Sequence, residues 1–152
     1  MAIERTLVLC KPDAVQRGLV GRILARFERK GLKIAGLKML RIDEGLAAQH
    51  YRDHLEKPFY PQLRAFVTSS PVVAMAIEGD NAVQVVRTLL GTTDAQQAAP
   101  GTIRGDFGMN VTKNLVHGSD SLDSAKREIA LFFEETELYD YDRSVQEWLG
   151  YD

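Results

Sequence analysis

The residue with the clearest chemical potential in this sequence is His117. It ends a short apolar segment and precedes Gly118-Ser119-Asp120, a turn that leads into a helix. A neutral imidazole can attack phosphorus directly, and N–H groups at the start of a helix stabilise the phosphoryl group that the ring then carries. Glu128 lies about two turns along that helix, where its carboxylate could hold the second ring nitrogen. Taken alone, this spacing favours an ordinary strand-end histidine and a solvated glutamate.

Other polar and aromatic residues stand where regular structure is expected to end. Each has an ordinary interpretation as a surface cation, a turn residue or a partly buried aromatic. In a chain without excess positive charge, they together suggest a site for a phosphate and a base: Lys11, Tyr51, Phe59, Arg87, Thr93 and Arg104. No Walker sequence or GxGxxG is present, so neither standard glycine loop holds the phosphate, and no Cys/His set has zinc spacing.

Length and composition define the setting of this site. With 152 residues, 45% hydrophobic and 26% charged, the sequence predicts one globular domain, 1–152, and excludes collagen, a disordered chain and a disulfide scaffold. The net charge of −2 argues against a nucleic-acid-binding protein, because any polyanion site must be a local cluster. A single cysteine, no signal-peptide layout and no apolar run long enough to span a membrane predict a cytoplasmic protein without membrane contact.

The elements that must position these residues follow from hydrophobic periodicity. Apolar runs predict strands over 6–10, 33–42, 72–77 and 115–117, with the third a central strand covered on both faces. Helices are predicted over 20–30, after Asp43, from Pro61, after Asp80 and from about Ser121. The order β-α-β-(αα)-β-α-β-α predicts an α+β fold, a ferredoxin-like α/β sandwich. It has an antiparallel four-stranded sheet, helices on one face and an inserted helical hairpin.

Two segments lack a predicted place in this core. Residues 91–114 show no apolar periodicity, and a structureless loop of that length in a compact domain is usually functional. The tail, about 134–152, carries Tyr139, Tyr141, Trp148 and Tyr151 and is too apolar to be simply disordered. We therefore expect the tail to dock on the core or on a neighbouring subunit, and the protein to form a homo-oligomer.

The motifs resemble those of the nucleoside diphosphate kinase family. The run Asn114-Leu115-Val116-His117-Gly118-Ser119-Asp120 is similar to the N-x-x-H-G-S-D signature around that family's phosphorylated histidine. Further similar segments, spread in register along the chain, are Lys11-Pro12-Asp13 with Val15-Gln16-Arg17-Gly18, Lys57-Pro58-Phe59, Pro100 to Asp106, and Arg127-Glu128-Ile129. Two departures, Ala14 in place of a common glycine and Asp94-Ala95 in place of a common Asn-Pro, flank the site and bear on loop stiffness.

The resemblance implies a role for each candidate residue. His117 would be the nucleophile, Glu128 the group that fixes its second nitrogen, and Tyr51 a neighbour of the imidazole. Lys11 would contact both the ribose and the transferring phosphate. The remaining nucleotide contacts would be made by Arg87, Thr93, Arg104 and His54 at the phosphates, Asn114 at the ribose, and Phe59, Leu63 and Val111 at the base. Mg²⁺ would enter on the nucleotide phosphates, with Asp120 reaching it at most through water.

The implied activity is transfer of the γ-phosphoryl group of ATP or another NTP to a nucleoside diphosphate. Transfer would be ping-pong, through a phosphohistidine, and would maintain NTP and dNTP pools. Because the candidate base contacts are apolar, we expect broad base tolerance. The tail resembles that of hexameric members, so a homohexamer is favoured over a tetramer. The alternatives are a non-catalytic nucleotide-binding regulatory module of the same fold, and a histidine phosphatase that releases inorganic phosphate.

Overall fold

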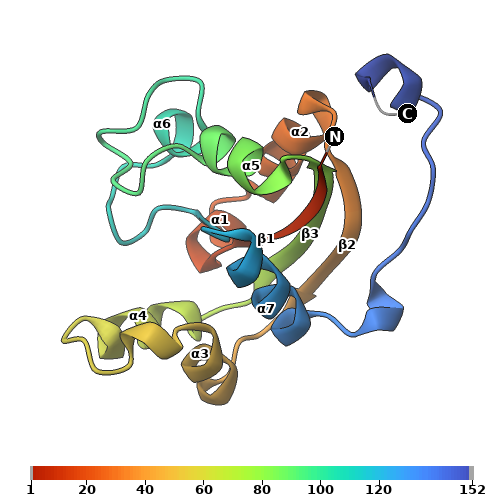
Figure 1. Cartoon of the computed structure of the whole chain (residues 1–152). Helices are drawn as coiled ribbons and strands as arrows, with labels where there is room; N and C mark the ends of the chain where they lie inside the picture. The colour runs from red at the N-terminus through yellow and green to blue at the C-terminus, as the bar shows by residue number, and fades with distance from the viewer. Residues whose placement is uncertain (1, 151–152) are drawn as a thin grey trace.

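The computed structural model describes residues 2–150, and its centre is a four-stranded antiparallel sheet (Figure 1). The strands are β1 (Ile3–Cys10), β2 (Lys33–Leu40), β3 (Val72–Asp80) and β4 (Val116–Gly118), and they lie in the order β2-β3-β1-β4. This confirms the predicted ferredoxin-like sheet. The strand bounds differ by a few residues, since β1 begins at Ile3, β2 ends before residue 42 and β4 is shifted by one residue.

The helices begin and end largely where local signals predict. They are α1 (Pro12–Gln16), α2 (Val20–Lys30), α3 (Glu44–His50), α4 (Tyr60–Val67), α5 (Ala82–Leu90), α6 (Ile103–Phe107) and α7 (Leu122–Phe132). Short 3-10 turns are η1 (Arg52–His54), η2 (Glu135–Glu137) and η3 (Gln146–Leu149). Gly31 ends α2 with φ of 103°, and the side chains of Asp43 and Ser121 accept N–H groups at the starts of α3 and α7.

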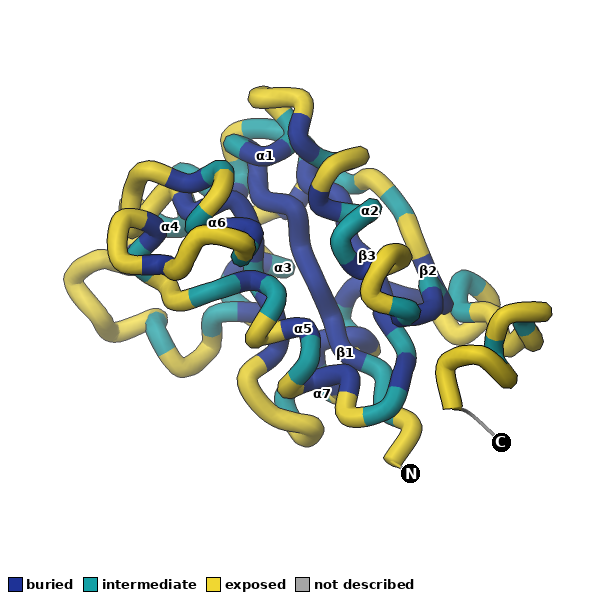
Figure 2. Tube along the Cα trace, turned by 90° about the horizontal axis from the view of Figure 1, so that it is seen from above, coloured by how far each residue is buried: buried dark blue, intermediate teal, exposed yellow. Residues whose placement is uncertain are grey.

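Helices cover both faces of the sheet, so the prediction of helices on one face was wrong. Val8 and Cys10 of β1 pack in one core with α2 and α5, whereas Leu7 and Leu9 pack in a second core with α3, α4 and α7. β1 lies between these two cores and is buried over most of its length, as its dark blue trace in Figure 2 shows. The physical reason is the continuous apolar sequence of the central strands, whose alternate side chains both require cover.

The long loop contains one helix that periodicity does not reveal. Within residues 91–114, α6 has only five residues and is capped by Thr102, whose hydroxyl accepts the N–H of Gly105 at 3.0 Å. The expectation of a segment without regular structure was therefore wrong over 103–107. A helix this short can show no amphipathic repeat, but a threonine cap can still define its start.

The entry into β4 is fixed by residues near the start of the chain. Leu115 is fully buried and has a left-handed backbone, with φ of 75°. Its N–H donates to the carboxylate of Asp13 at 3.0 Å, and its carbonyl accepts the N–H of Lys11 at 2.8 Å. β4 then pairs with β1, and His117 lies opposite Leu9. These contacts define the position of the candidate nucleophile.

The tail packs along β2, the edge strand, as far as the structure describes it (Figure 1). The Tyr139 N–H donates to the Ala35 carbonyl at 2.8 Å, and the Tyr141 hydroxyl donates to the Ile34 carbonyl at 2.6 Å. Trp148 is nevertheless 81% exposed, and Tyr151 lies outside the described residues. The tail thus docks on its own core but leaves its largest aromatic uncovered. Among the described helices, none is long and apolar enough to cross a membrane.

Candidate active site

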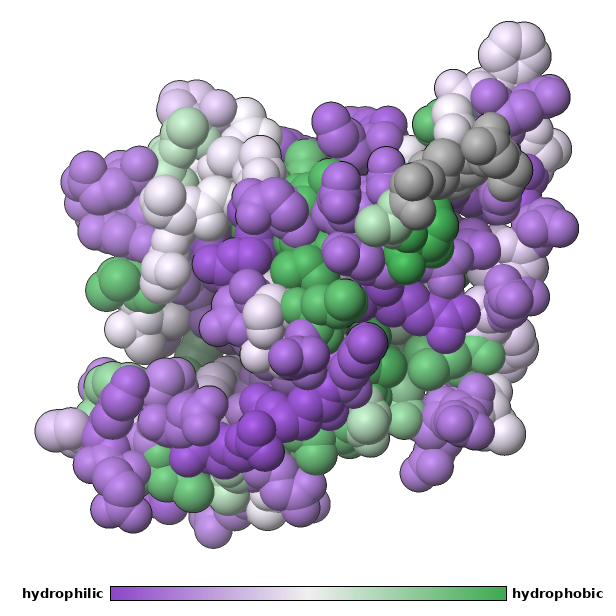
Figure 3. Space-filling view, viewed as in Figure 1, coloured by the Kyte–Doolittle hydropathy of each residue, from purple (hydrophilic) through white to green (hydrophobic). Residues whose placement is uncertain are grey.

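A cavity of about 370 Å³ lies where β1 ends and β4 carries His117. In the space-filling view the surface is hollowed between the long loop with α6 and the α3–α4 hairpin (Figure 3). Most of the site residues predicted from the sequence line this one cavity: Lys11, Tyr51, His54, Leu63, Arg87, Thr93, Arg104, Asn114, His117, Asp120 and Glu128.

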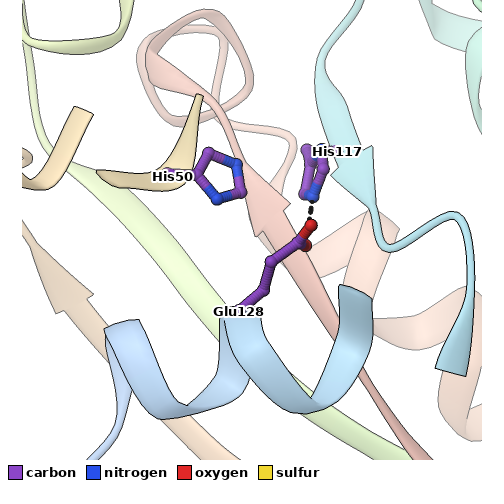
Figure 4. A group of neighbouring side chains, drawn as sticks. All are labelled: His50, His117 and Glu128. Atoms are coloured by element: carbon purple, nitrogen blue, oxygen red, sulfur yellow. Dashed lines mark hydrogen bonds and ion pairs between the residues drawn. The ribbon is translucent and has the colours of Figure 1, made fainter. Parts of the chain in front are cut away.

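His117 is held at one ring nitrogen by Glu128 (Figure 4). Its Nε2 lies 2.7 Å from Glu128 Oε1, and the hydroxyl of Ser119 donates to the same oxygen at 2.8 Å. An ionised carboxylate can only accept, so Nε2 carries the proton and the lone pair of the neutral ring is on Nδ1. Nδ1 makes no hydrogen bond with the described residues. The arrangement leaves that nitrogen available as a nucleophile.

Glu128 remains ionised despite its burial. Burial alone would raise the pKa of this carboxyl, but the hydrogen bond from His117, together with the attraction between the two groups when that ring is protonated, outweighs the effect of burial. The hydrogen bond from the Ser119 hydroxyl acts in the same direction, and the pKa is lowered overall. The side chain is only 7% exposed, so its hydrogen bonds are shielded from competing water. The carboxylate can therefore stabilise an imidazolium that forms when His117 reacts.

Lys11 is a buried cation at the end of β1. Its ammonium donates to the side-chain oxygen of Asn114, whose amide donates in turn to the carbonyl of Thr93 at 3.0 Å. Burial and the nearby charge of Arg104 lower the pKa of Lys11 to about 8, with Asp13 acting in the opposite direction. The ordinary interpretation, a plain surface lysine, was thus wrong. A desolvated ammonium of this kind gains strongly from an anionic ligand.

Arg104 both lines the cavity and anchors the long loop. Its guanidinium donates to the carbonyls of Gly91 at 2.8 Å, Val116 at 2.7 Å and Asn114 at 3.2 Å. Burial, followed by the charge of Arg87, lowers its pKa to about 10, so it stays charged at neutral pH. The sequence predicts a contact with phosphate but not this second role, because the three carbonyls come together only in the folded chain.

An aromatic group on α3 contacts His117, the candidate nucleophile. The ring of His50 lies edge-to-face with that of His117, at 4.6 Å between centroids, and at 4.5 Å from that of Tyr51. Burial, then the charge of His117, lowers the pKa of His50 to about 3, with Glu128 opposing, so His50 is neutral at physiological pH. Burial, together with the charge of Glu128, raises the pKa of Tyr51, which keeps its hydroxyl protonated.

Two predicted base contacts are not among the residues that line the cavity. Phe59 is 48% exposed and lies 5.5 Å from the ring of His54, and Val111 is 55% exposed on the long loop. Of the predicted apolar contacts for the base, Leu63 alone lines the cavity. The structure thus places no closed apolar slot around these residues.

Sequence reasoning missed several residues of the site. His50, Asp53, Ser124 and Arg127 line the cavity, and Ser119 shares the Glu128 oxygen with His117. Each of these residues is either adjacent in sequence to a predicted residue or about one helical turn away from one. Adjacency was therefore the available signal.

The site combines a histidine with one unoccupied ring nitrogen, a carboxylate that holds the other, and several cations around one cavity. Imidazole supplies a nucleophile, and buried cations supply the charge neutralisation that phosphoryl transfer requires. The geometry is therefore suited to phosphoryl transfer.

Comparison with known proteins agrees with this class. The family model described as nucleoside diphosphate kinase matches residues 4–138. A nucleoside diphosphate kinase of Archaeoglobus fulgidus is 55% identical over 97% of both chains, and one of Pelotomaculum thermopropionicum is 56% identical over 97% of this chain and 99% of that protein. The solved structure of a halophilic nucleoside diphosphate kinase from Halobacterium salinarum in complex with CDP superposes with a TM-score of 0.95. It is 55% identical, covering 97% of this chain and 99% of that one.

The chain belongs to the nucleoside diphosphate kinase family. It is a phosphotransferase that uses a nucleoside diphosphate as acceptor, as the sequence predicts.

Proposed function

We propose that His117 is the catalytic nucleophile and carries the phosphoryl group on Nδ1. The observation that supports this is the 2.7 Å contact between Nε2 and Glu128, which leaves Nδ1 without a partner among the described residues. In the first half-reaction, the Nδ1 lone pair forms a bond to the γ-phosphorus of the triphosphate. The bond between that phosphorus and the bridging oxygen breaks, and the nucleoside diphosphate leaves with the electron pair.

The second half-reaction is the reverse with another nucleotide. A terminal oxygen of the incoming diphosphate attacks the phosphorus, the N–P bond breaks, and the imidazole regains its lone pair. Glu128 keeps the proton on Nε2 throughout and stabilises the positive ring. Tyr51 packs against the ring of His50, which in turn contacts that of His117. One site thus serves donor and acceptor in turn.

The nucleotide contacts are assigned from charge and position. Arg87, Thr93 and Arg104 line the cavity and would bind the phosphates, with His54 nearby. Lys11 would contact both the ribose and the transferring phosphate. The CDP complex of the Halobacterium salinarum relative supports a nucleoside diphosphate as ligand.

The remaining assignments concern the sugar and the base. Asn114 would bond the ribose, since its side chain is already held by Lys11 and Thr93. The base would lie against Leu63, with Phe59 and Val111 closing over it from their exposed positions. Apolar contacts offer no code of donors and acceptors, so all common bases should be accepted.

The site fits Mg²⁺ carried by nucleotide phosphates. Asp120 and Asp53 are the exposed carboxylates of the cavity, and carboxylate oxygen is the ligand type that Mg²⁺ prefers. Asp120 would hold the ion through water. When bound, Mg²⁺ neutralises phosphate charge and orients the phosphates.

We further propose that the chain acts as one domain, 1–152, in a cytoplasmic homohexamer, with a tetramer as the alternative. Support comes from exposed apolar side chains on β2 and the tail: Leu37, Met39, Tyr139 and Trp148. Light scattering should give six times the chain mass of 17.0 kDa. Four times that mass would support the tetramer, and a monomer would reject assembly.

The nucleophile is tested by labelling with γ-labelled ATP. The protein should acquire acid-labile, alkali-stable label, which a chase with ADP, GDP, CDP or UDP should remove at similar rates. His117→Ala should abolish labelling and transfer while nucleotide binding persists. A non-catalytic regulatory module would acquire no label, and a histidine phosphatase would release the label as inorganic phosphate without a diphosphate.

A further inference from the structure

His50, His117 and Glu128 form a cluster with the geometry of a metal site. One ligand atom from each lies within 4.8 Å of the other two (Figure 4). The three side chains converge from separate elements, α3, β4 and α7, so the fold itself brings them together. We propose that this cluster is an inhibitory Zn²⁺ site, distinct from the position of nucleotide-borne Mg²⁺.

The unexplained residue in the cluster is His50. It is 5% exposed, and neither ring nitrogen has a hydrogen-bond partner among the described residues. Buried polar atoms are normally paired, and an exception requires an explanation. The mechanism proposed above uses neither nitrogen. A metal ion would satisfy one of them, because an unpaired imidazole nitrogen is a free ligand.

The donor set selects zinc rather than magnesium. Two imidazoles and one carboxylate are typical of a zinc site with an open fourth position, whereas Mg²⁺ requires oxygen ligands. Tetrahedral bonds of about 2.1 Å place ligand atoms about 3.4 Å apart. Binding therefore requires the 2.7 Å pair of His117 and Glu128 to open slightly, within a cluster whose ligand atoms already lie within 4.8 Å of one another. The cavity supplies the open position for water.

A metal ion in this site would prevent phosphorylation of His117, because it would change which ring nitrogen carries the proton. The nucleophile needs its proton on Nε2 and its lone pair on Nδ1. Coordination uses the Nε2 lone pair, so the proton moves from Nε2 to Nδ1 and the ring stays neutral. Nδ1–H cannot attack phosphorus. This consequence rests on the proposed role of His117, but metal binding itself does not.

Binding is tested with Co²⁺ as a spectroscopic probe for Zn²⁺ on the nucleotide-free full chain. Wild type should show intense visible bands of tetrahedral cobalt, which Zn²⁺ abolishes and excess Mg²⁺ leaves unchanged. His50→Phe, which keeps a ring in place, should weaken binding by more than the roughly 10–100-fold that loss of an outer-shell partner costs. His50→Gln is the second variant, in case the phenyl ring impairs folding. The chain has three histidines, and His54→Ala should retain the bands.

The tautomer is measured by NMR of the histidine side chains. His117 should carry its proton on Nε2 in the free protein and on Nδ1 with Zn²⁺ bound. Labelling of the wild type by γ-labelled ATP should be blocked after incubation with Zn²⁺ and recover on chelation, while the labelling rate of His50→Phe, whatever its value without metal, should not change when Zn²⁺ is added. Weak bands typical of octahedral cobalt, or equal Co²⁺ affinity in wild type and His50→Phe, would overturn the proposal of a Zn²⁺ site. If His117→Ala still transfers phosphate while the cobalt results hold, the proposed nucleophile is wrong and the metal site stands.

Discussion

Replacement of Glu128 by glutamine tests how much the carboxylate contributes to catalysis. Glu128→Gln keeps the size of the side chain and an oxygen that can accept from His117 and Ser119, but it removes the charge. A hydrogen bond to a charged group contributes about 1.5–3 kcal/mol, against about 1 kcal/mol for a neutral one. Loss of about 1–2 kcal/mol of stabilisation for the imidazolium should slow phosphorylation of His117 roughly 5–30-fold.

The assay is a single turnover with Mg·ATP and excess enzyme, which follows formation of the phosphohistidine. Nucleotide affinity should be unchanged, because Glu128 acts through the ring. Asp123→Asn is the matched control, with the same loss of charge from an exposed residue of α7 that does not line the cavity. A wild-type rate for Glu128→Gln would refute the role of the carboxylate, and a parallel loss of nucleotide affinity would show that it maintains the pocket instead.

The remaining predictions concern pH, the loop anchor and one glycine. Because the pKa of Lys11 is about 8, kcat/KM for nucleotide should fall as pH rises through that value, and Lys11→Arg should remove this limb of the profile. Between pH of about 8 and the ordinary lysine pKa of 10.5, Lys11 is protonated in the unfolded chain but neutral in the folded protein. The free energy of unfolding should therefore rise with pH in this interval, measured as an increase in the urea midpoint of the wild type relative to Lys11→Met. Arg104→Ala removes the guanidinium donor from three carbonyls, of which only that of Asn114 is known to keep another, the N–H of Val116 at 2.9 Å, and should lower the free energy of unfolding by about 2–4 kcal/mol. Arg17→Ala, which frees one exposed carbonyl, should cost less than about 1 kcal/mol. Gly105→Ala places a Cβ 1.9 Å from the carbonyl oxygen of Ala99, so the loop must rearrange and transfer should fall at least tenfold; an unchanged rate would mean that the loop is not positioned by this contact.

The sequence predicts those parts of the fold whose causes are local. Gly31 and Asp43 end and begin helices as expected, since a left-handed cap and a side-chain acceptor act within a few residues. The start of β1 at Ile3 was not predicted, because it depends on pairing with Asp80 across the sheet. The continuous apolar sequence of β3 already indicates that both faces of the sheet are covered, but the order of residues does not state which helix packs against which face.

In the candidate site too, features that depend on local spacing could be predicted, and features that depend on tertiary packing could not. Helical spacing could suggest that Glu128 reaches His117, and the structure places them in contact. The unpaired ring of His50 follows from packing between α3 and α7, which no spacing along the chain encodes. The exposure of Phe59 was also unpredictable, because an aromatic residue at that position fits a buried and an open slot equally well.

The anchoring of Leu115 by Asp13 and Lys11 has a consequence for the order in which the protein folds. The two groups of the Asp13 contact are 102 residues apart, and β4 pairs with β1 alone. Closing so long a loop costs entropy that only formation of the sheet offsets, so β4 should join late. During synthesis, β1 leaves the ribosome long before His117 is made. A nascent or truncated chain can therefore bury much of its sheet, yet it does not have His117, the proposed nucleophile, in position until nearly the whole chain is complete.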